Sequence, residues 1–229
     1  MTNSHFTGSL TKLSRATKFI DELEILFNDY NNNEPYSAKL NFANNPPSVV
    51  IEWKGLGYEA MAVLGDAVHN LRAALDLLAS ELARINGKSD HSVYFPFATT
   101  KANFPNAIKN RNFDKAGLDA VTLLYTFAPY RGGNELLRAL HDLDIEDKHT
   151  SLLETYKSND FEFKATIDPA NPMESKLDSF KTGPIQHHFS NGSPLPEKPV
   201  IETLRAIQHE VSRVVAAFQD LVLSQTKNT

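Results

Sequence analysis

The sequence has no cysteine among its 229 residues, and this absence excludes several classes of function. Without thiols there is no disulfide framework, no thiolate site for zinc or an iron–sulfur cluster, and no cysteine nucleophile. The chain also lacks the uninterrupted run of about 20 apolar residues that a membrane-spanning helix needs. Its first residues lack the apolar segment of a secretory signal. The sequence therefore predicts a cytoplasmic protein with no membrane partner.

Positive charge is also scarce, because 23 Lys and Arg face 28 Asp and Glu, for a net charge of −5. This balance argues against a protein that coats nucleic acid broadly, although it leaves room for a local basic pocket. The chain contains no phosphate-binding P-loop, no dinucleotide-binding glycine motif after a strand, and no Gly-x-Ser-x-Gly nucleophile motif. No cofactor is therefore expected.

A long helix expected over residues 58–85 is the most informative segment. Its leucines share one face, and small residues fill much of the second face. Between Met61 and Ala83 it contains few charges and no lysine, and Asn86-Gly87 supplies a stop signal. A helix with this pattern is packed on two sides, so its ionic side chains need partners inside the molecule.

The remaining pattern predicts more helices and a few short strands. Helical periodicity covers a segment from near Ser9 to Tyr30, residues 113–127, residues 134–144 with a continuation to 153, and the chain from Pro199 onward. Alternation predicts a hairpin near 38–54 and a strand at 161–167 paired with 185–189, whereas 90–112 and 168–183 are irregular.

The expected fold is therefore mainly α and forms a single domain over residues 1–229. It is an antiparallel bundle of four to six helices with small antiparallel β-hairpin insertions near 38–54 and 160–190. The terminal helices carry heptad-like seams, which favour pairing of two copies. We therefore expect a homodimer.

The first candidate centre lies on the middle helix. His69, Arg72 and Asp76 are three, four and seven positions apart, so they share a narrow arc of its surface, and Asn70 is adjacent in sequence. One interpretation is an internal network of ion pairs that locks two helices together. The alternatives are a solvated face, or a polar pocket wall that binds an anionic group or moves a proton.

The second candidate centre is Asp147-Lys148-His149, at an expected junction between two helices. Asp147 is a candidate cap for the following helix, whose free N–H groups would attract an anion. In a functional interpretation, His149 acts as general acid or base and Lys148 stabilises developing negative charge.

Two weaker candidates complete the set. Tyr130 opens the sequence Tyr130-Arg131-Gly132-Gly133, which forms either a tight turn or a backbone approach to a phosphate. Asp66 and His69, together with Asp144, Asp147 and His149, have the donor types of a nitrogen and oxygen metal site. The repeated Glu-x2-His motif of di-iron bundles is absent, and no metal site is expected.

Four motifs occur in one order: residues 69–79 (HNLRAALDLLA), Phe95-Pro96-Phe97, Pro129-Tyr130 and Asp147-Lys148-His149. This order resembles a family of uncharacterised bacterial proteins with an HNLRxALDxLA helix, an FP loop, a PY turn and a late DKH motif. The similarity covers roughly residues 56 to 155. It implies a shared architecture and no defined activity.

A more distant likeness is to HEPN-type helical bundles, many of which are metal-independent ribonucleases of bacterial defence or toxin–antitoxin systems. Their signature is Arg, four to six residues, then His, and Arg138 and His141 are too close to match it. Under this resemblance Arg72 supplies the cation and His149 the acid or base. Two functions follow: a bacterial accessory or interaction protein whose centre is structural or holds a small anionic ligand, and a HEPN-like ribonuclease acting on RNA.

Overall fold

The computed structural model describes residues 4–149, 153 and 155–226. The helices are α1 (Thr7–Asn32), α2 (Tyr58–Ile85), α3 (Phe104–Asn110), α4 (Leu118–Phe127), α5 (Glu135–His149) and α6 (Val200–Thr226). The strands are β1 (Tyr36–Asn41), β2 (Ser48–Trp53), β3 (Thr155–Ser158), β4 (Phe161–Thr166), β5 (Lys176–Thr182) and β6 (Gln186–Phe189).

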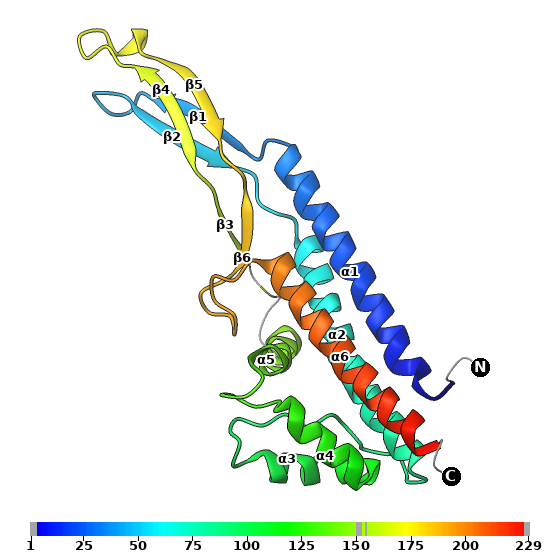
Figure 1. Ribbon diagram of the computed structural model, residues 1–229. Coiled ribbons are helices and arrows are strands. Elements are labelled where there is room, and N and C mark those ends of the chain that lie inside the picture. The colour runs from blue at the N-terminus through cyan, green and yellow to red at the C-terminus, as the bar shows by residue number, and fades with distance from the viewer. Residues whose placement is uncertain (1–3, 150–152, 154, 227–229) are drawn as a thin grey trace.

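Three long helices, α1, α2 and α6, run side by side and form the body of the molecule (Figure 1). α2 is packed on both sides, since its buried positions extend from Ala60 to Ala83 and include Arg72 and Glu81. The expectation of a sandwiched middle helix is confirmed. α5 lies against α2 and α6, and α3 and α4 lie near the end of the body where α2 finishes (Figure 1).

The mainly helical composition is confirmed, and the expected bounds of the middle helix coincide with those of α2. Other boundaries differ. The helix expected over 113–127 is interrupted at Gly117, whose φ of +98° separates a 3-10 turn from α4. A helix, α3, occupies part of the segment 90–112 that showed no regular pattern. α5 continues without a break to His149, so Asp147 does not cap a second helix.

Within the described part of the chain, the strands form three antiparallel pairs, β1 with β2, β3 with β6, and β4 with β5. The hairpin expected near 38–54 is confirmed, but the expected partner of β4 is wrong, because β4 pairs with β5 and residues 186–189 pair with β3. We call β1, β2, β4 and β5 together the β arm. The arm projects from the end of the helical body, and β3 and β6 connect β4 and β5 to that body (Figure 1).

The two terminal helices lie against each other, so their apolar seams are covered within one chain. Arg205 of α6 donates to Asp21 and Glu24 of α1, at 2.6 and 3.0 Å, and Gln208 donates to Thr17 at 2.6 Å. The buried seam of α1 itself consists of Leu13, Ala16, Ile20, Leu23 and Phe27, next to Ser9.

No helix in the described ranges has an apolar stretch that would let it cross a bilayer.

Candidate functional site

The contact between α2 and α5 contains a polar centre around Asp144. The carboxylate of Asp144 is buried, and it accepts from His69 Nδ1 at 3.2 Å and from Lys148 Nζ at 2.7 Å. An ionised carboxylate only accepts, so this bond places a proton on Nδ1 of His69. The side chains of His69 and Lys148 are 43% and 42% exposed, so both reach solvent while their orientation is fixed from inside.

Asp147 lies one turn further along α5, directly against Gly65 of α2. A Cβ atom at residue 65 would lie 2.7 Å from Asp147 Oδ2 and closer still to Oδ1. The pKa of Asp147 lies above its ordinary value. Burial and the neighbouring carboxylates of Asp144 and Asp66 raise the pKa by more than His69 and Lys148 lower it. Carboxylates therefore outnumber cations at this end of the centre, which favours holding a proton over holding an anion.

Arg72 and Asp76 form a separate part of the contact and face inward. Arg72 is only 5% exposed, and its Nη1 lies 2.5 Å from Asp76 Oδ1. The same Oδ1 atom accepts the backbone N–H of Phe95 at 2.9 Å, and the guanidinium stands 4.5 Å from the centre of the Phe97 ring. This pair therefore fixes the Phe95-Pro96-Phe97 loop to α2, and Arg72 is not presented to a substrate.

Phe97 also connects Arg72 to His141 of α5. The rings of Phe97 and His141 are stacked, with centroids 4.7 Å apart and an angle of 2° between their planes. Burial lowers the pKa of His141 to about 4, and the charges of Arg72 and Arg138 add to that effect. His141 is therefore neutral at pH 7 and packs its ring against Phe97.

Two other predicted site residues, Asn70 and Tyr130, are buried and make contacts within the protein. Asn70 is buried, donates to Asp66 O at 2.8 Å and accepts from Lys12 of α1 at 3.1 Å. Tyr130 is buried, and its ring lies 5.4 Å from that of Phe104. The side chain of His149 lies outside the described residues.

The structure thus unites part of the predicted centre and separates the rest. His69 meets Lys148 through Asp144, whereas Arg72 and Asp76 pair with each other. The expected anion site at a helix start near Asp147 is wrong, because α5 is continuous there. Among the described residues, no group of three or more His, Asp or Glu has the arrangement of a metal site.

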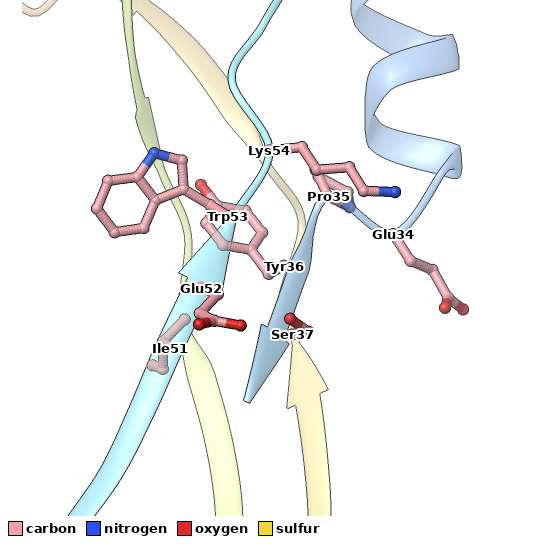
Figure 2. A pocket seen from close by; sticks show the side chains of 8 residues that line it. All are labelled: Glu34, Pro35, Tyr36, Ser37, Ile51, Glu52, Trp53 and Lys54. Carbon is pink, nitrogen blue, oxygen red and sulfur yellow. The ribbon is translucent and has the colours of Figure 1, made fainter. Parts of the chain in front are cut away.

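A second candidate site, not found from the sequence, lies at the base of the β arm. A groove of about 760 Å³ is lined by the start of β1 and the end of β2, including Pro35, Tyr36, Ile51 and Trp53. The indole of Trp53 points to the side opposite Lys54 (Figure 2). It is 67% exposed, although it ends an alternating row of apolar residues. In the sequence, the only signal of this site was the alternating row Val49, Ile51 and Trp53.

Aromatic and basic side chains connect the residues next to this groove with α1 and β3. Tyr30 of α1 donates to Lys54 O at 2.6 Å and accepts from Lys157 Nζ. The ammonium of Lys157 also lies 4.5 Å from the ring centre of Tyr30 and 5.6 Å from that of Tyr36. Burial lowers the pKa of Lys157. These contacts hold the arm to the end of α1.

Comparisons with models of known protein families, with curated proteins and with solved structures find no match for this chain.

Proposed function

We propose that the protein is an interaction protein that binds a protein partner through the β arm, and that the α2–α5 centre holds the fold. The observation that carries this proposal is the exposure of large apolar side chains on the arm. Trp53 is 67% exposed, Phe163 50% and Phe42 44%. These residues lie along the length of the arm, with Trp53 and Phe42 at opposite ends of the β1–β2 hairpin. Large apolar side chains exposed along a projecting element are typical of a surface that a partner covers.

The hydrogen bonding of the centre supports a structural role. Both oxygens of Asp144 are used within the molecule, and Asp76 is shared between Arg72 and the Phe95 backbone. A small anionic ligand would meet His69 and Lys148, but the surrounding carboxylates oppose it.

Photo-crosslinking in living cells tests this proposal. A benzophenone side chain replaces Trp53 in one variant and Ile25 of α1 in a matched control, where the side chain is 59% exposed. The proposal expects a discrete protein adduct from residue 53 and none from residue 25. Equal adducts from both positions, or none from either, would contradict it.

The ribonuclease is the second candidate, and the His69–Asp144 pair favours it. A buried carboxylate that fixes one ring nitrogen leaves the other available as general base or acid, and Lys148 lies beside it to stabilise charge on a phosphate. In this version Lys148 replaces the buried Arg72. Cleavage of single-stranded RNA by the purified protein in chelator should be lost in His69→Ala and kept in His91→Ala, since His91 is exposed. Absence of cleavage by the unmodified protein would rule this candidate out.

A further inference from the structure

The outer edge of β2 is unpaired among the described strands, since β2 pairs only with β1. The N–H of Lys54 donates to Pro35 O at 2.8 Å, so these two residues form a hydrogen-bonded pair of the antiparallel ladder. Such pairs alternate with pairs whose backbone groups point away from the partner strand. With the observed register, the backbone groups of Val49, Ile51 and Trp53 therefore point outward.

The edge of β2 is also more suitable than the edge of β4, whereas β1 and β5 lie against each other. The six residues of β2 pair with β1 without interruption. The β4–β5 pair has a register irregularity between Lys164 and Ala165, where Asp178 of β5 is the extra residue, and such a bulge bends and twists the pair, which disfavours edge-to-edge pairing. Pro47 lacks an N–H group at the next outward position, which confines the usable edge of β2 to the three outward residues.

The sequence of β2 is self-complementary. An antiparallel register centred on Ile51 places Ile51 opposite its own copy and Trp53 opposite Val49, so that all three outward residues exchange hydrogen bonds. Aromatic and β-branched residues pair favourably across strands. Glu52 would face Val50, and each Glu52 already has Lys39 as an ion-pair partner on its own hairpin. No uncompensated like charges are brought together.

We propose that the partner at this edge is a second copy of the chain, joined through β2 in an antiparallel register centred on Ile51. This inference rests on the proposed function and names the occupant of the same arm. A strand of six residues buries less surface than the roughly 1,200 Å² at the lower limit of standard interfaces. The dimer is therefore weak and concentration-dependent, and it continues the β1–β2 sheet across the two copies.

Sedimentation equilibrium from micromolar to millimolar concentration tests the association. The mean mass should rise from 25.5 kDa towards twice that value. Ile51→Pro removes an N–H group that points outward and makes no hydrogen bond to β1. The substitution should therefore weaken dimerisation at least about tenfold. Thr182→Pro is the matched control, because the bond of Gly183 N to Asp160 O makes the next pair, Phe161 and Thr182, one whose N–H groups point outward, and Thr182 is exposed. It should leave the association unchanged.

The register has its own readout, which does not depend on a proline variant folding. The chain has no cysteine, so Lys54→Cys gives one spin-label site per copy. A register centred on Ile51 separates the two copies of residue 54 by six residues, or about 20 Å. A register centred on Val49 would separate the two copies of residue 54 by about 34 Å, and one centred on Trp53 by about 7 Å.

A single mass of 25.5 kDa at all concentrations, equal effects of the two proline changes, or a label distance of another register would overturn the inference. A monomer that still forms the crosslink at residue 53 to a different protein would overturn only this inference. A monomer without any crosslink would overturn the proposed function as well.

Discussion

Glu81 of α2 is hydrogen-bonded to the start of α1. Its replacement is the sharpest test of the inference that the buried charged residues of α2 have partners inside the molecule. The residue is only 3% exposed, and its carboxylate accepts from Gly8 N at 2.7 Å, Ser9 Oγ at 2.7 Å and Ser9 N at 3.4 Å. Gly8 and Ser9 lie in the first turn of α1, where N–H groups have no partner within the helix. Glu81 thus caps one helix from the side of another.

The magnitude follows from these bonds. Hydrogen bonds to a charged group contribute about 1.5–3 kcal/mol each, and a buried donor without a partner costs about 1–3 kcal/mol. The two bonds of 2.7 Å alone are worth about 3 kcal/mol at the lower end of this range, and the cavity left by Glu81→Ala adds to the loss, so we expect the free energy of unfolding to fall by at least about 3–4 kcal/mol. Glu81→Gln keeps the shape and one acceptor and should cost about 1–2 kcal/mol.

Urea unfolding followed by circular dichroism measures both variants, with the exposed Glu22→Gln of α1 as control, expected within about 0.5 kcal/mol of the parent. For a chain of this length the Glu81→Ala loss corresponds to a decrease in Tm of roughly 6–16 °C. A Glu81→Ala protein as stable as the control would refute the reasoning that α2 places its charges on internal partners.

Three further outcomes are expected. Gly65→Ala should cost about 1–3 kcal/mol in urea unfolding, because its Cβ would collide with the carboxylate of Asp147. Burial holds the pKa of His141 and His187 at about 4, below the value of about 6.5 for an unfolded chain, so the unfolded state binds more protons in between. Stability should be fully present above about pH 6.5 and fall as pH drops towards 4; a flat urea midpoint would contradict this. Trp53→Ala should change unfolding free energy by less than about 0.5 kcal/mol, since the side chain is largely exposed.

The sequence predicted the long helices well because their signals are local. The bounds of α2 follow from apolar periodicity and from Asn86-Gly87, where Gly87 has a φ of +68°. Asn134 was expected to begin the next helix, and its Oδ1 accepts the N–H of Leu137 at 3.1 Å. Periodicity and capping act within a few residues and are visible in the chain itself.

The strand β5 was missed for a physical reason. Its apolar residues Leu177 and Phe180 are three positions apart, which breaks the alternation expected of a strand. The structure shows a register shift in which Lys164 pairs with Ser179 and Ala165 with Leu177. A bulge adds a residue to one strand and changes which positions share a face. Its location depends on the partner strand and not on the sequence of β5 alone.

The candidate centre was predicted only in part, because helix continuity decides which residues face α2. A break before Asp147 made Asp147, Lys148 and His149 the expected group. In the continuous α5, positions 141, 144 and 147 recur at helical spacing and meet α2 at Arg72, His69 and Gly65. Asp144 therefore became the shared acceptor.

Residue-resolved amide hydrogen exchange at low and high protein concentration tests most directly the claim that the β arm makes the contacts and the helical centre holds the fold. The account predicts slow exchange throughout the middle of α2 at both concentrations. On β2, the amides of Val50 and Glu52 should be protected at both, while those of Val49, Ile51 and Trp53 exchange rapidly when dilute and slow down when concentrated. The account would be contradicted if all amides of β2 exchanged at the same rate at both protein concentrations. Fast exchange at the centre of α2 would also contradict it.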